Sequence, residues 1–478
     1  MSDILQRVRS ANPIFGHDDV DPAEFELALA EIEDRWEFGN ESPRIPGARR
    51  PGWVRPALVA AGAALLVILA IATPILLLRG EEQPVTDTTL PPATTTSLTP
   101  TTTLPVTTTT PTTIPPPTPT APAMTWTRLP DDPMFDSTAI WTITAGGPGL
   151  VAAGGSHTDD GMMVNAIVWT SSDGVTWERI DDPSFSSGIP PAEISYENPG
   201  AGIGDVAAGP LGVVGVGFNG HGAAVWTSPD GIEWSPTDDA DLLGGGFSSI
   251  LGVTAGGPGW VAVGEVDMDG GVWVSEDGLD WVQVEDDALL AGDRIDVSIY
   301  DVATWNGGLI AVGSVGLWDG SDERAIRGAV WASRDGLEWR ELDGDSFKEQ
   351  KTFERVAVDP STGAVLAFGW AGISKSLGGE DWILVPKDEA VGGPPPGSGV
   401  GWSGDHVVAG GPDMALSLWV SDDSGGTWHR VDPNDQSFEG YNPGVDDVVL
   451  FGDRFVVVGA AGDYLQEVGA IWIGTWDE

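Results

Sequence analysis

The sequence predicts an all-β protein, a seven-bladed β-propeller whose last blade is closed by an N-terminal strand. Tryptophan recurs seven times at intervals of 43 to 58 residues, which is the period of a propeller blade. Short runs rich in Val, Ile and Ala separate these tryptophans and supply about four strands per period. A four-stranded sheet repeated radially is a propeller. The recurring residues are Trp126, Trp177, Trp234, Trp281, Trp339, Trp382 and Trp428.

A Ser-x-Asp-Gly phrase precedes most of these tryptophans and predicts a tight turn between the third and fourth strands of each blade. Asp and Ser side chains bond nearby backbone amides, and Gly accepts a positive φ. The tryptophan that follows packs its ring on a neighbouring turn or blade, while its indole N–H finds a partner. The aspartates of the five clearest copies are Asp173, Asp230, Asp277, Asp335 and Asp423.

The two ends of the repeat set the number of blades. The last period runs from about residue 456 to 473, and the chain stops at Glu478 before a fourth strand. Residues 125–133 (TWTRLPDDP) match residues 176–183 (TWERIDDP), which follow the third strand of the first period. We therefore expect the N-terminal segment to supply the missing outer strand, because closing the ring removes an exposed sheet edge.

The turn phrase resembles the Asp-box (BNR) repeat, Ser/Thr-x-Asp-x-Gly-x-Thr-Trp, of sialidase-like propellers. The resemblance covers about residues 124 to 478. The copy at residues 421–428 fits the pattern in full, four copies are one residue shorter, and the copy at 376–382 has Gly where Asp belongs. That group contains sialidases and several non-catalytic propellers. The resemblance implies the fold, and it implies that the repeat aspartates are structural residues far from any active site.

The N-terminal quarter has a different composition and predicts a membrane anchor. Residues 57–78 carry no charge, which suffices for one transmembrane helix within 56–79. More arginines stand before this segment than after it, so residues 1–55, with two short helices, are expected in the cytoplasm. Residues 80–123 are almost entirely Thr and Pro and predict a disordered stalk. The propeller, residues 124–478, would then be extracellular on a single-pass signal-anchored cell-membrane protein; the long polar tail disfavours a cleaved signal peptide.

Charge restricts the class of partner. Residues 124–478 contain fourteen basic and fifty-eight acidic side chains and no cysteine, so binding to nucleic acid or to anionic lipid is disfavoured. A cationic partner, cation binding and solubility in salt all remain open. Paired aspartates at 131–132, 181–182, 238–239 and 286–287 recur with the repeat and indicate turns or links between blades. Calcium is an alternative for these oxygens, although their spacing matches no known ligand order; no other cofactor or metal is predicted.

Loops that depart from the repeat predict the ligand-binding face, opposite the Ser-x-Asp-Gly turns. Insertions occur at about residues 156–163, 184–204 and 316–327, and propellers usually bind ligands over their central channel on the loop face. The alternative is that these are ordinary long loops. The candidate ligand-binding residues are His157, Tyr196, His221, Trp318, Arg324, Arg327, Tyr441 and Tyr464.

No catalytic residue is assigned. A sialidase needs three arginines around the sugar carboxylate and a Tyr/Glu nucleophile, whereas Arg294, Arg324 and Arg327, which could share a face, are expected on adjacent blades. No Ser-His-Asp order, phosphate loop or zinc spacing occurs. The sequence therefore favours a cell-surface, non-catalytic propeller that binds or scaffolds an extracellular glycan or protein. The alternatives are an exo-acting, sialidase-like glycoside hydrolase and a transmembrane sensor whose tail binds a cytoplasmic regulator protein.

Overall fold

The computed structural model describes the propeller except for parts of its longer loops, and it leaves the N-terminal quarter undescribed. The described residues are 124–158, 161–190, 193–195, 200–220, 222–237, 248–290, 294–318, 324–379, 381–385, 399–411, 418–432, 438, 444–462 and 468–476. The expected tail (1–55), transmembrane helix (56–79) and stalk (80–123) lie outside these ranges. Within them, no helix is long and apolar enough to cross a membrane.

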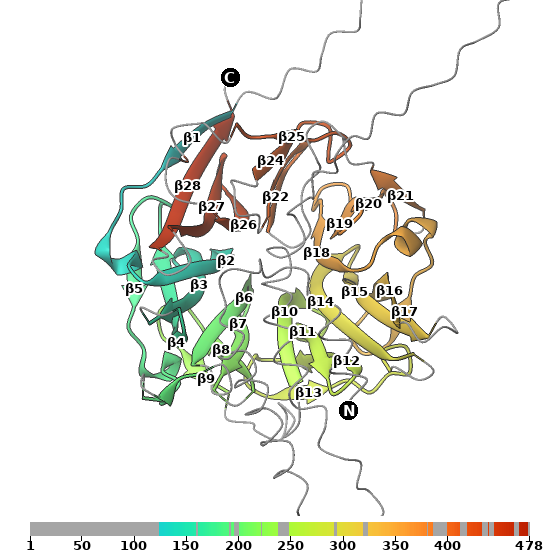
Figure 1. Cartoon of the computed structure of the whole chain (residues 1–478), viewed down its shortest axis with the longest axis horizontal. Helices are drawn as coiled ribbons and strands as arrows, with labels where there is room; N and C mark the ends of the chain where they lie inside the picture. The colour runs from blue at the N-terminus through green and yellow to red at the C-terminus, as the bar shows by residue number, and fades with distance from the viewer. Residues whose placement is uncertain are drawn as a thin grey trace, which may run out of the picture. The chain divides into compact units, whose positions relative to one another are not determined.

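Seven antiparallel four-stranded sheets stand around a common axis (Figure 1), so the predicted all-β, seven-bladed propeller is confirmed. We number the blades along the chain, and the strands of each run from the axis outward. Blade 1 contains β2 (Thr138–Gly146), β3 (Gly149–His157), β4 (Met163–Ser171) and β5 (Glu178–Ile180); blade 2 contains β6 (Ala201–Gly209), β7 (Gly212–Asn219), β8 (Ala223–Ser228) and β9 (Ser235–Pro236). Blade 3 contains β10 (Ser248–Gly256), β11 (Gly259–Val266), β12 (Asp269–Ser275) and β13 (Trp281–Gln283).

The later blades repeat the same order. Blade 4 contains β14 (Asp296–Trp305), β15 (Gly308–Trp318), β16 (Arg324–Ser333) and β17 (Trp339–Glu341); blade 5 contains β18 (Phe353–Val358), β19 (Val365–Gly369), β20 (Gly372–Ser376) and β21 (Trp382–Val385). Blade 6 contains β22 (Val400–Ser403), β23 (His406–Gly410), β24 (Leu418–Ser421) and β25 (His429–Arg430). Blade 7 contains β26 (Gly444–Phe451), β27 (Arg454–Ala461), β28 (Val468–Trp476) and β1 (Met124–Arg128), and 3₁₀ turns lie at η1 (Pro133–Phe135), η2 (Pro183–Phe185) and η4 (Asp345–Glu349).

The N-terminal strand closes the ring as predicted. β1 pairs antiparallel with β28, from Met124 opposite Trp476 to Arg128 opposite Trp472. Trp126 is buried in the core shared by blades 6 and 7, where its ring lies 5.7 Å from that of Phe438. One blade is therefore built from both ends of the described chain, and β1 covers the edge of β28 so that this sheet also has four strands.

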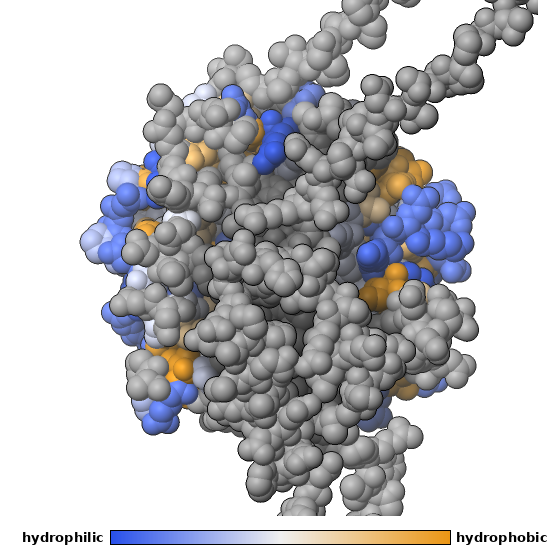
Figure 2. Space-filling model, in the orientation of Figure 1, coloured by the Kyte–Doolittle hydropathy of each residue, from blue (hydrophilic) through white to orange (hydrophobic). Residues whose placement is uncertain are grey.

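The hydrophobic core lies between blades. Its clusters join neighbouring sheets; in one of them Val214 and Val225 of blade 2 pack with Trp260 and Trp273 of blade 3. The third strand carries a buried tryptophan in every blade except blade 5. These residues are Trp169, Trp226, Trp273, Trp331, Trp419 and Trp472. Such rings bury large apolar areas, so each blade is stabilised mainly by the two blades beside it. Where described side chains are visible in Figure 2, hydrophilic residues dominate the margins of the propeller, with separate hydrophobic patches among them.

The Ser-x-Asp-Gly turns share one detailed geometry. In blade 2, Asp230 Oδ1 accepts the amides of Ile232 (2.8 Å) and Glu233 (2.9 Å), and Ser228 Oγ accepts the amide of Gly231 (2.8 Å). Gly231 has φ of 81°, and its carbonyl accepts the indole N–H of Trp234 at 3.0 Å. The side chains of Asp173, Asp277, Asp335 and Asp423 make corresponding bonds in their own turns.

The paired aspartates hold turns, and one of them links blades. Asp132 and Asp182 each accept the amide two residues on, at the start of η1 and η2. Asp286 accepts the amide of Ala288 with Oδ1 and that of Trp339, in blade 4, with Oδ2. These residues play the turn and interblade roles that their recurrence predicts, while Asp238 and Asp239 lie outside the described residues.

Candidate functional site

A β-bulge interrupts the inner strand of six blades and turns polar side chains toward the axis. The register shifts between Ile203 and Asp205 in blade 2, and between Ile299 and Asp301 in blade 4. Bulges re-aim a side chain by inserting one unpaired residue. The residues placed just after the bulges are Thr142, Asp205, Gly252, Asp301, Arg355 and Asp447. We call Thr142, Asp205, Asp301, Arg355 and Asp447 the axial ring.

The axial ring hydrogen-bonds one blade to the next. Asp447 Oδ2 of blade 7 accepts the amide of Ile143 in blade 1, Asp205 Oδ2 accepts that of Val253 in blade 3, and Asp301 Oδ2 accepts that of Val356 in blade 5, each at 2.8 Å. Between blades 1 and 2, Thr142 Oγ1 accepts the amide of Val206 and donates to Asp205 Oδ1, at 3.2 Å in both cases. These bonds satisfy backbone amides exposed by the bulges, which would be costly to bury unpaired.

Where the preceding blade offers no acceptor, an aspartate caps its own strand. Blade 3 has Gly252 at the ring position, and the next blade's Asp301 accepts the amide of its own neighbour Val302 with Oδ1. Asp447 does the same for Val448. Each aspartate of the ring therefore accepts hydrogen bonds with both of its carboxylate oxygens, and the donors to the two oxygens belong to different blades.

The ring is electrostatically unbalanced. Its three aspartates face a single cation, Arg355, whose Nη1 lies 3.9 Å from Asp301 Oδ1. Burial raises the pKa of Asp301 to about 7 and that of Asp447 to about 6, against the lowering effect of Arg355. The charges of Asp301, Asp205 and Asp447 raise the pKa of the Arg355 guanidinium against its burial. The axis is thus a region where negative charge is concentrated and incompletely compensated.

A second group of residues lies at the end of the axis where the inner strands begin. Tyr300 and Glu354 are the bulged residues of β14 and β18, Glu265 belongs to β11, and Trp370 is in the turn between β19 and β20. That turn lies beside the start of β18, since Gly369 pairs with Phe353. This end is opposite the Ser-x-Asp-Gly turns, which join third to fourth strands. We call Glu265, Tyr300, Glu354 and Trp370 the loop-end cluster.

Tyr300 is held as a neutral phenol among acids. Burial raises its pKa, the negative charges of Glu265 and Glu354 raise it further, and hydrogen bonds to Ser298 and Ser314 oppose the rise. Burial also raises the pKa of Glu354, whose carboxylate is hydrogen-bonded by Trp370. The Trp370 side chain remains 39% exposed. Carboxylates beside aromatic rings suit an ammonium or guanidinium group, by ion pairing and cation–π attraction.

The structure describes only some of the eight ligand-binding residues that the sequence predicts. Tyr196, His221, Tyr441 and Tyr464 lie outside the described residues, and for Trp318 and Arg324 only the strand positions are described, paired at the end of β15 and β16. His157 ends β3; burial lowers its pKa, against a hydrogen bond with the Ser137 backbone. Arg327 lies in β16. Their convergence on one site therefore stays a prediction.

Arg294 and Arg327, expected on adjacent blades, meet on one carboxylate. Both bind Glu341 of β17: Arg294 Nη2 lies 2.5 Å from Oε2 and Arg327 Nη2 lies 2.6 Å from Oε1. Arg294 stands two residues before β14, in the connection between blades 3 and 4, whereas Arg327 lies in β16 of blade 4. The arginine pair is thus committed to a carboxylate of the protein itself.

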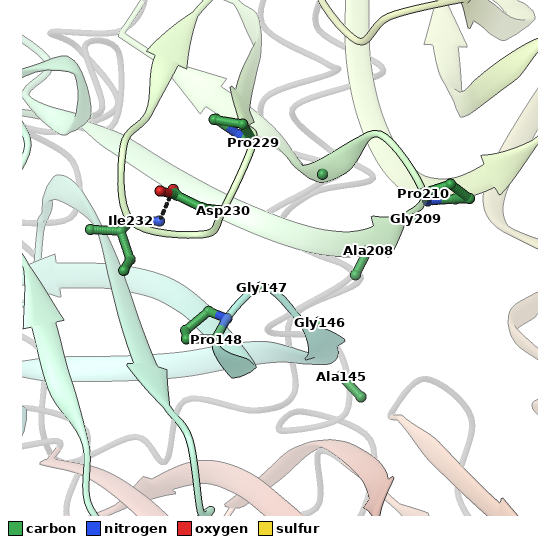
Figure 3. A pocket seen from close by; sticks show the side chains of 11 residues that line it. Ala145, Gly146, Gly147, Pro148, Ala208, Gly209, Pro210, Pro229, Asp230 and Ile232 are labelled. Atoms are coloured by element: carbon green, nitrogen blue, oxygen red, sulfur yellow. Dashed lines mark hydrogen bonds between the residues drawn. The ribbon is translucent and has the colours of Figure 1, made fainter.

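Two cavities in the described part of the propeller lie beside blade 1. A cavity of ≈ 560 Å³ separates blades 1 and 2 at the Ser-x-Asp-Gly end, lined by Pro148, Pro210, Pro229, Asp230 and Ile232 among others (Figure 3). One of ≈ 290 Å³ lies at the outer edge of blade 1, beside Arg179 and Asp182. No group of three or more His, Asp or Glu side chains in the described ranges is arranged to hold a metal ion.

Sequence reasoning missed Tyr300, Glu354, Trp370 and the axial ring. A signal for the ring is present: Ile203-Gly204-Asp205-Val206, Ile299-Tyr300-Asp301-Val302 and Val445-Asp446-Asp447-Val448 repeat one pattern within the inner strands. The loop-end cluster has no comparable local signature, because its members come from β11, β14, β18 and a turn.

No protein-family model and no curated protein matches the chain. Solved structures resemble it in fold. YCF48 bound to D1 peptide is 15% identical over 75% of this chain and 100% of its own, with a TM-score of 0.45. YCF48 from Cyanidioschyzon merolae is 16% identical over 73% and 98%, with a TM-score of 0.43. Trypanosoma rangeli sialidase in complex with sialic acid is 14% identical over 74% and 59%, with a TM-score of 0.38.

Proposed function

We propose that the propeller is a non-catalytic binding module, displayed at the cell surface, that takes a cationic side chain of an extracellular protein at the loop-end cluster. The observation that carries this proposal is the placement of two carboxylates around Tyr300 beside the exposed ring of Trp370. A cationic ligand would lower the cost of burying Glu354, whereas an anionic sugar acid would meet Glu265 and Glu354 as like charges. The strongly acidic composition of residues 124–478 favours encounter with the same kind of ligand.

The state of Tyr300 supports binding rather than covalent catalysis. A nucleophilic tyrosine needs a neighbour that withdraws its proton and favours the phenolate. Here burial and the charges of both glutamates raise the Tyr300 pKa, and the side chains that hydrogen-bond with Tyr300 are Ser298 and Ser314 rather than a carboxylate. The two described arginine side chains expected for a sugar carboxylate, Arg294 and Arg327, are paired with Glu341.

Two small probes of equal length test the proposal on the full chain. We expect acetyl-Leu-Arg-Leu-amide to bind, as measured by calorimetry, and acetyl-Leu-Glu-Leu-amide not to bind. Glu354→Gln should weaken the binding of the arginine probe about fivefold, which corresponds to the loss of an ion pair of about 1 kcal/mol. Glu178→Gln, an exposed carboxylate on the outer strand of blade 1, is the matched control and should leave affinity unchanged. Equal binding of both probes, or no effect of Glu354→Gln, would contradict this assignment.

One observation favours a second candidate, a sialidase-like glycoside hydrolase. Tyr300 and Glu354 stand at equivalent bulges of adjacent blades and influence one another electrostatically, and a Tyr/Glu pair is what such an enzyme uses. Turnover of a fluorogenic sialoside by the full chain, abolished by Tyr300→Phe, would establish hydrolysis. Absence of turnover together with binding of the arginine probe would support the binding module over the hydrolase.

A further inference from the structure

At the Ser-x-Asp-Gly end of the propeller, four successive blades carry an exposed aliphatic side chain at one position of the turn, and blade 5 exposes Leu377 (75%) at a different position of its turn. The residue after the turn glycine is Val175, Ile232, Leu279 or Leu337 in blades 1 to 4, and these side chains are 48 to 50% exposed. The corresponding residues in blades 5 and 6 are Glu380 and Gly426. We call the four aliphatic residues the apolar arc.

The turns between first and second strands add apolar residues at this end. Pro148, Pro210 and Pro258 occupy these turns in blades 1 to 3, and Leu211 beside Pro210 is 51% exposed. Blade 5 has Pro360 followed by Ser361, and blades 4, 6 and 7 have the polar residues Asn306, Asp405 and Asp453. In Figure 3 the turn with Pro148 faces the turn with Asp230 and Ile232 across the ≈ 560 Å³ cavity. Apolar side chains from two blades therefore border one cavity, which distinguishes them from single exposed residues scattered over a surface.

The arc is held rigidly by the turns. The amides of Val175, Ile232, Leu279 and Leu337 donate to the aspartate of their own turn at 2.8 to 2.9 Å. The glycine before each has a φ of 75° to 83° and accepts the indole N–H of the buried tryptophan through its carbonyl. A surface whose backbone is already fixed loses little conformational entropy when it binds.

Carboxylates alternate with the aliphatic side chains. Glu233, Asp280 and Glu338 directly follow Ile232, Leu279 and Leu337, and all three are exposed. The turn aspartates stay ionised as well, because backbone amides lower the pKa of Asp230, Asp277 and Asp335. Three successive blades thus repeat the order carboxylate, aliphatic, carboxylate.

We propose that the apolar arc and its carboxylates form a docking surface for a basic amphipathic segment of another protein, in which Lys or Arg alternates with aliphatic residues. Apolar side chains of such a segment cover the arc, and its cations pair with Glu233, Asp280 and Glu338. A second copy of this chain would oppose like charges at every blade of the arc. An anionic membrane surface is repelled for the same reason.

The test uses the full chain and a fluorescein-labelled twelve-residue peptide of alternating lysine and leucine, with fluorescence anisotropy as the readout. We expect binding that weakens with added salt. Replacing the arc by serine (Val175→Ser, Ile232→Ser, Leu279→Ser, Leu337→Ser) should weaken it at least about tenfold. Glu233→Gln, Asp280→Asn and Glu338→Gln together should weaken it about fivefold and reduce its salt dependence.

Matched controls separate this surface from general stickiness. Val282→Ser with Ile383→Ser removes aliphatic side chains of outer strands that are 65% and 63% exposed and lie outside the arc; binding should not change. A peptide of alternating lysine and serine tests charge alone, and one of alternating glutamate and leucine tests apolar contact alone; both should bind at least about tenfold more weakly. Equal binding by either peptide, no binding of the lysine–leucine peptide, or an unchanged affinity in the arc variant with unaltered circular dichroism would overturn the proposal. Equal affinity for anionic vesicles would replace it with a membrane surface.

Discussion

At the scale of single residues, aspartate does two different jobs in this protein, and burial distinguishes them. In the Ser-x-Asp-Gly turns the carboxylate is exposed, and hydrogen bonds from backbone amides lower the pKa, to about 2 for Asp173. In the axial ring the carboxylate also accepts backbone amides, yet desolvation outweighs them and raises the pKa of Asp301 and Asp447. Hydrogen bonds from the same kind of donor therefore accompany opposite shifts of the pKa. In the axial ring, the cost of removing water from the ionised carboxylate exceeds the stabilisation that two backbone amides provide.

The turn aspartates should contribute modestly to stability. We expect Asp230→Ala to lower the free energy of unfolding by about 1 kcal/mol, since it removes the acceptor of two amides that solvent can partly replace. Guanidinium denaturation of the full chain measures the change. The control is Glu233→Ala in the same turn, whose side chain is exposed and whose amide bond to Asp230 is retained. A loss in the control as large as in Asp230→Ala would assign the effect to the chain position rather than to the carboxylate.

At the scale of elements, a repeat makes prediction efficient. Aligning one period of the sequence with the next predicts the strand count, the third-to-fourth-strand turns and the closing role of residues 125–128. It does so because every blade buries equivalent residues against its neighbours. Insertions are predicted less well: Gly316 and Arg327, expected within a loop, lie inside β15 and β16. The ends of these long strands and the loops between them are both rich in Gly and Asp. The amino-acid composition therefore does not show at which residue the strand pairing ends.

The closing strand should be essential to the last blade. We expect removal of residues 124–134 from the full chain to lower the midpoint of thermal unfolding by on the order of 10 °C, because it deletes the buried Trp126 and exposes the edge of β28. Tryptophan fluorescence during heating measures the transition. Removal of residues 113–123, immediately before β1, is the control of equal length. An unchanged midpoint in the first variant would contradict the requirement for closure.

At the scale of the whole molecule, ring closure creates the features that sequence reasoning missed. Tyr300 and Glu354 belong to different periods, and their proximity depends on how far each inner strand reaches along the axis. Arg294 and Arg327 are a second example: Arg294 lies in the connection between blades 3 and 4, Arg327 lies in blade 4, and the two meet on Glu341. Periodicity specifies which residues are equivalent, but contacts between non-equivalent positions require the three-dimensional ring.

The axial ring should make the whole propeller less stable as the pH rises toward 8. Asp301 and Asp447 have folded-state pKa values of about 7 and about 6, above the ordinary 3.8. A raised pKa means that the folded state binds the proton more tightly, so this stabilisation is complete below pH 3.8 and is lost as the pH rises through 6 and 7. Each unit of pKa difference corresponds to about 1.4 kcal/mol. Glu354 acts in the same direction, and His157, whose pKa is lowered, acts against it below pH 6.5.

The measurement is guanidinium denaturation of the full chain at intervals between pH 5 and 8, with the midpoint expected to fall as the pH rises. Asp301→Asn with Asp447→Asn should flatten this dependence, because asparagine keeps an oxygen acceptor for the interblade amides and does not titrate. Asp277→Asn is the matched control: its carboxyl has a lowered pKa and stays ionised throughout this range, so its removal should shift the curve without changing its slope. What rising pH adds is mainly the cost of burying the ionised carboxylates, and to a smaller extent their mutual repulsion. A midpoint that rises with pH in the wild type, or a slope that survives in the double variant, would place the dominant titrating groups outside the axial ring.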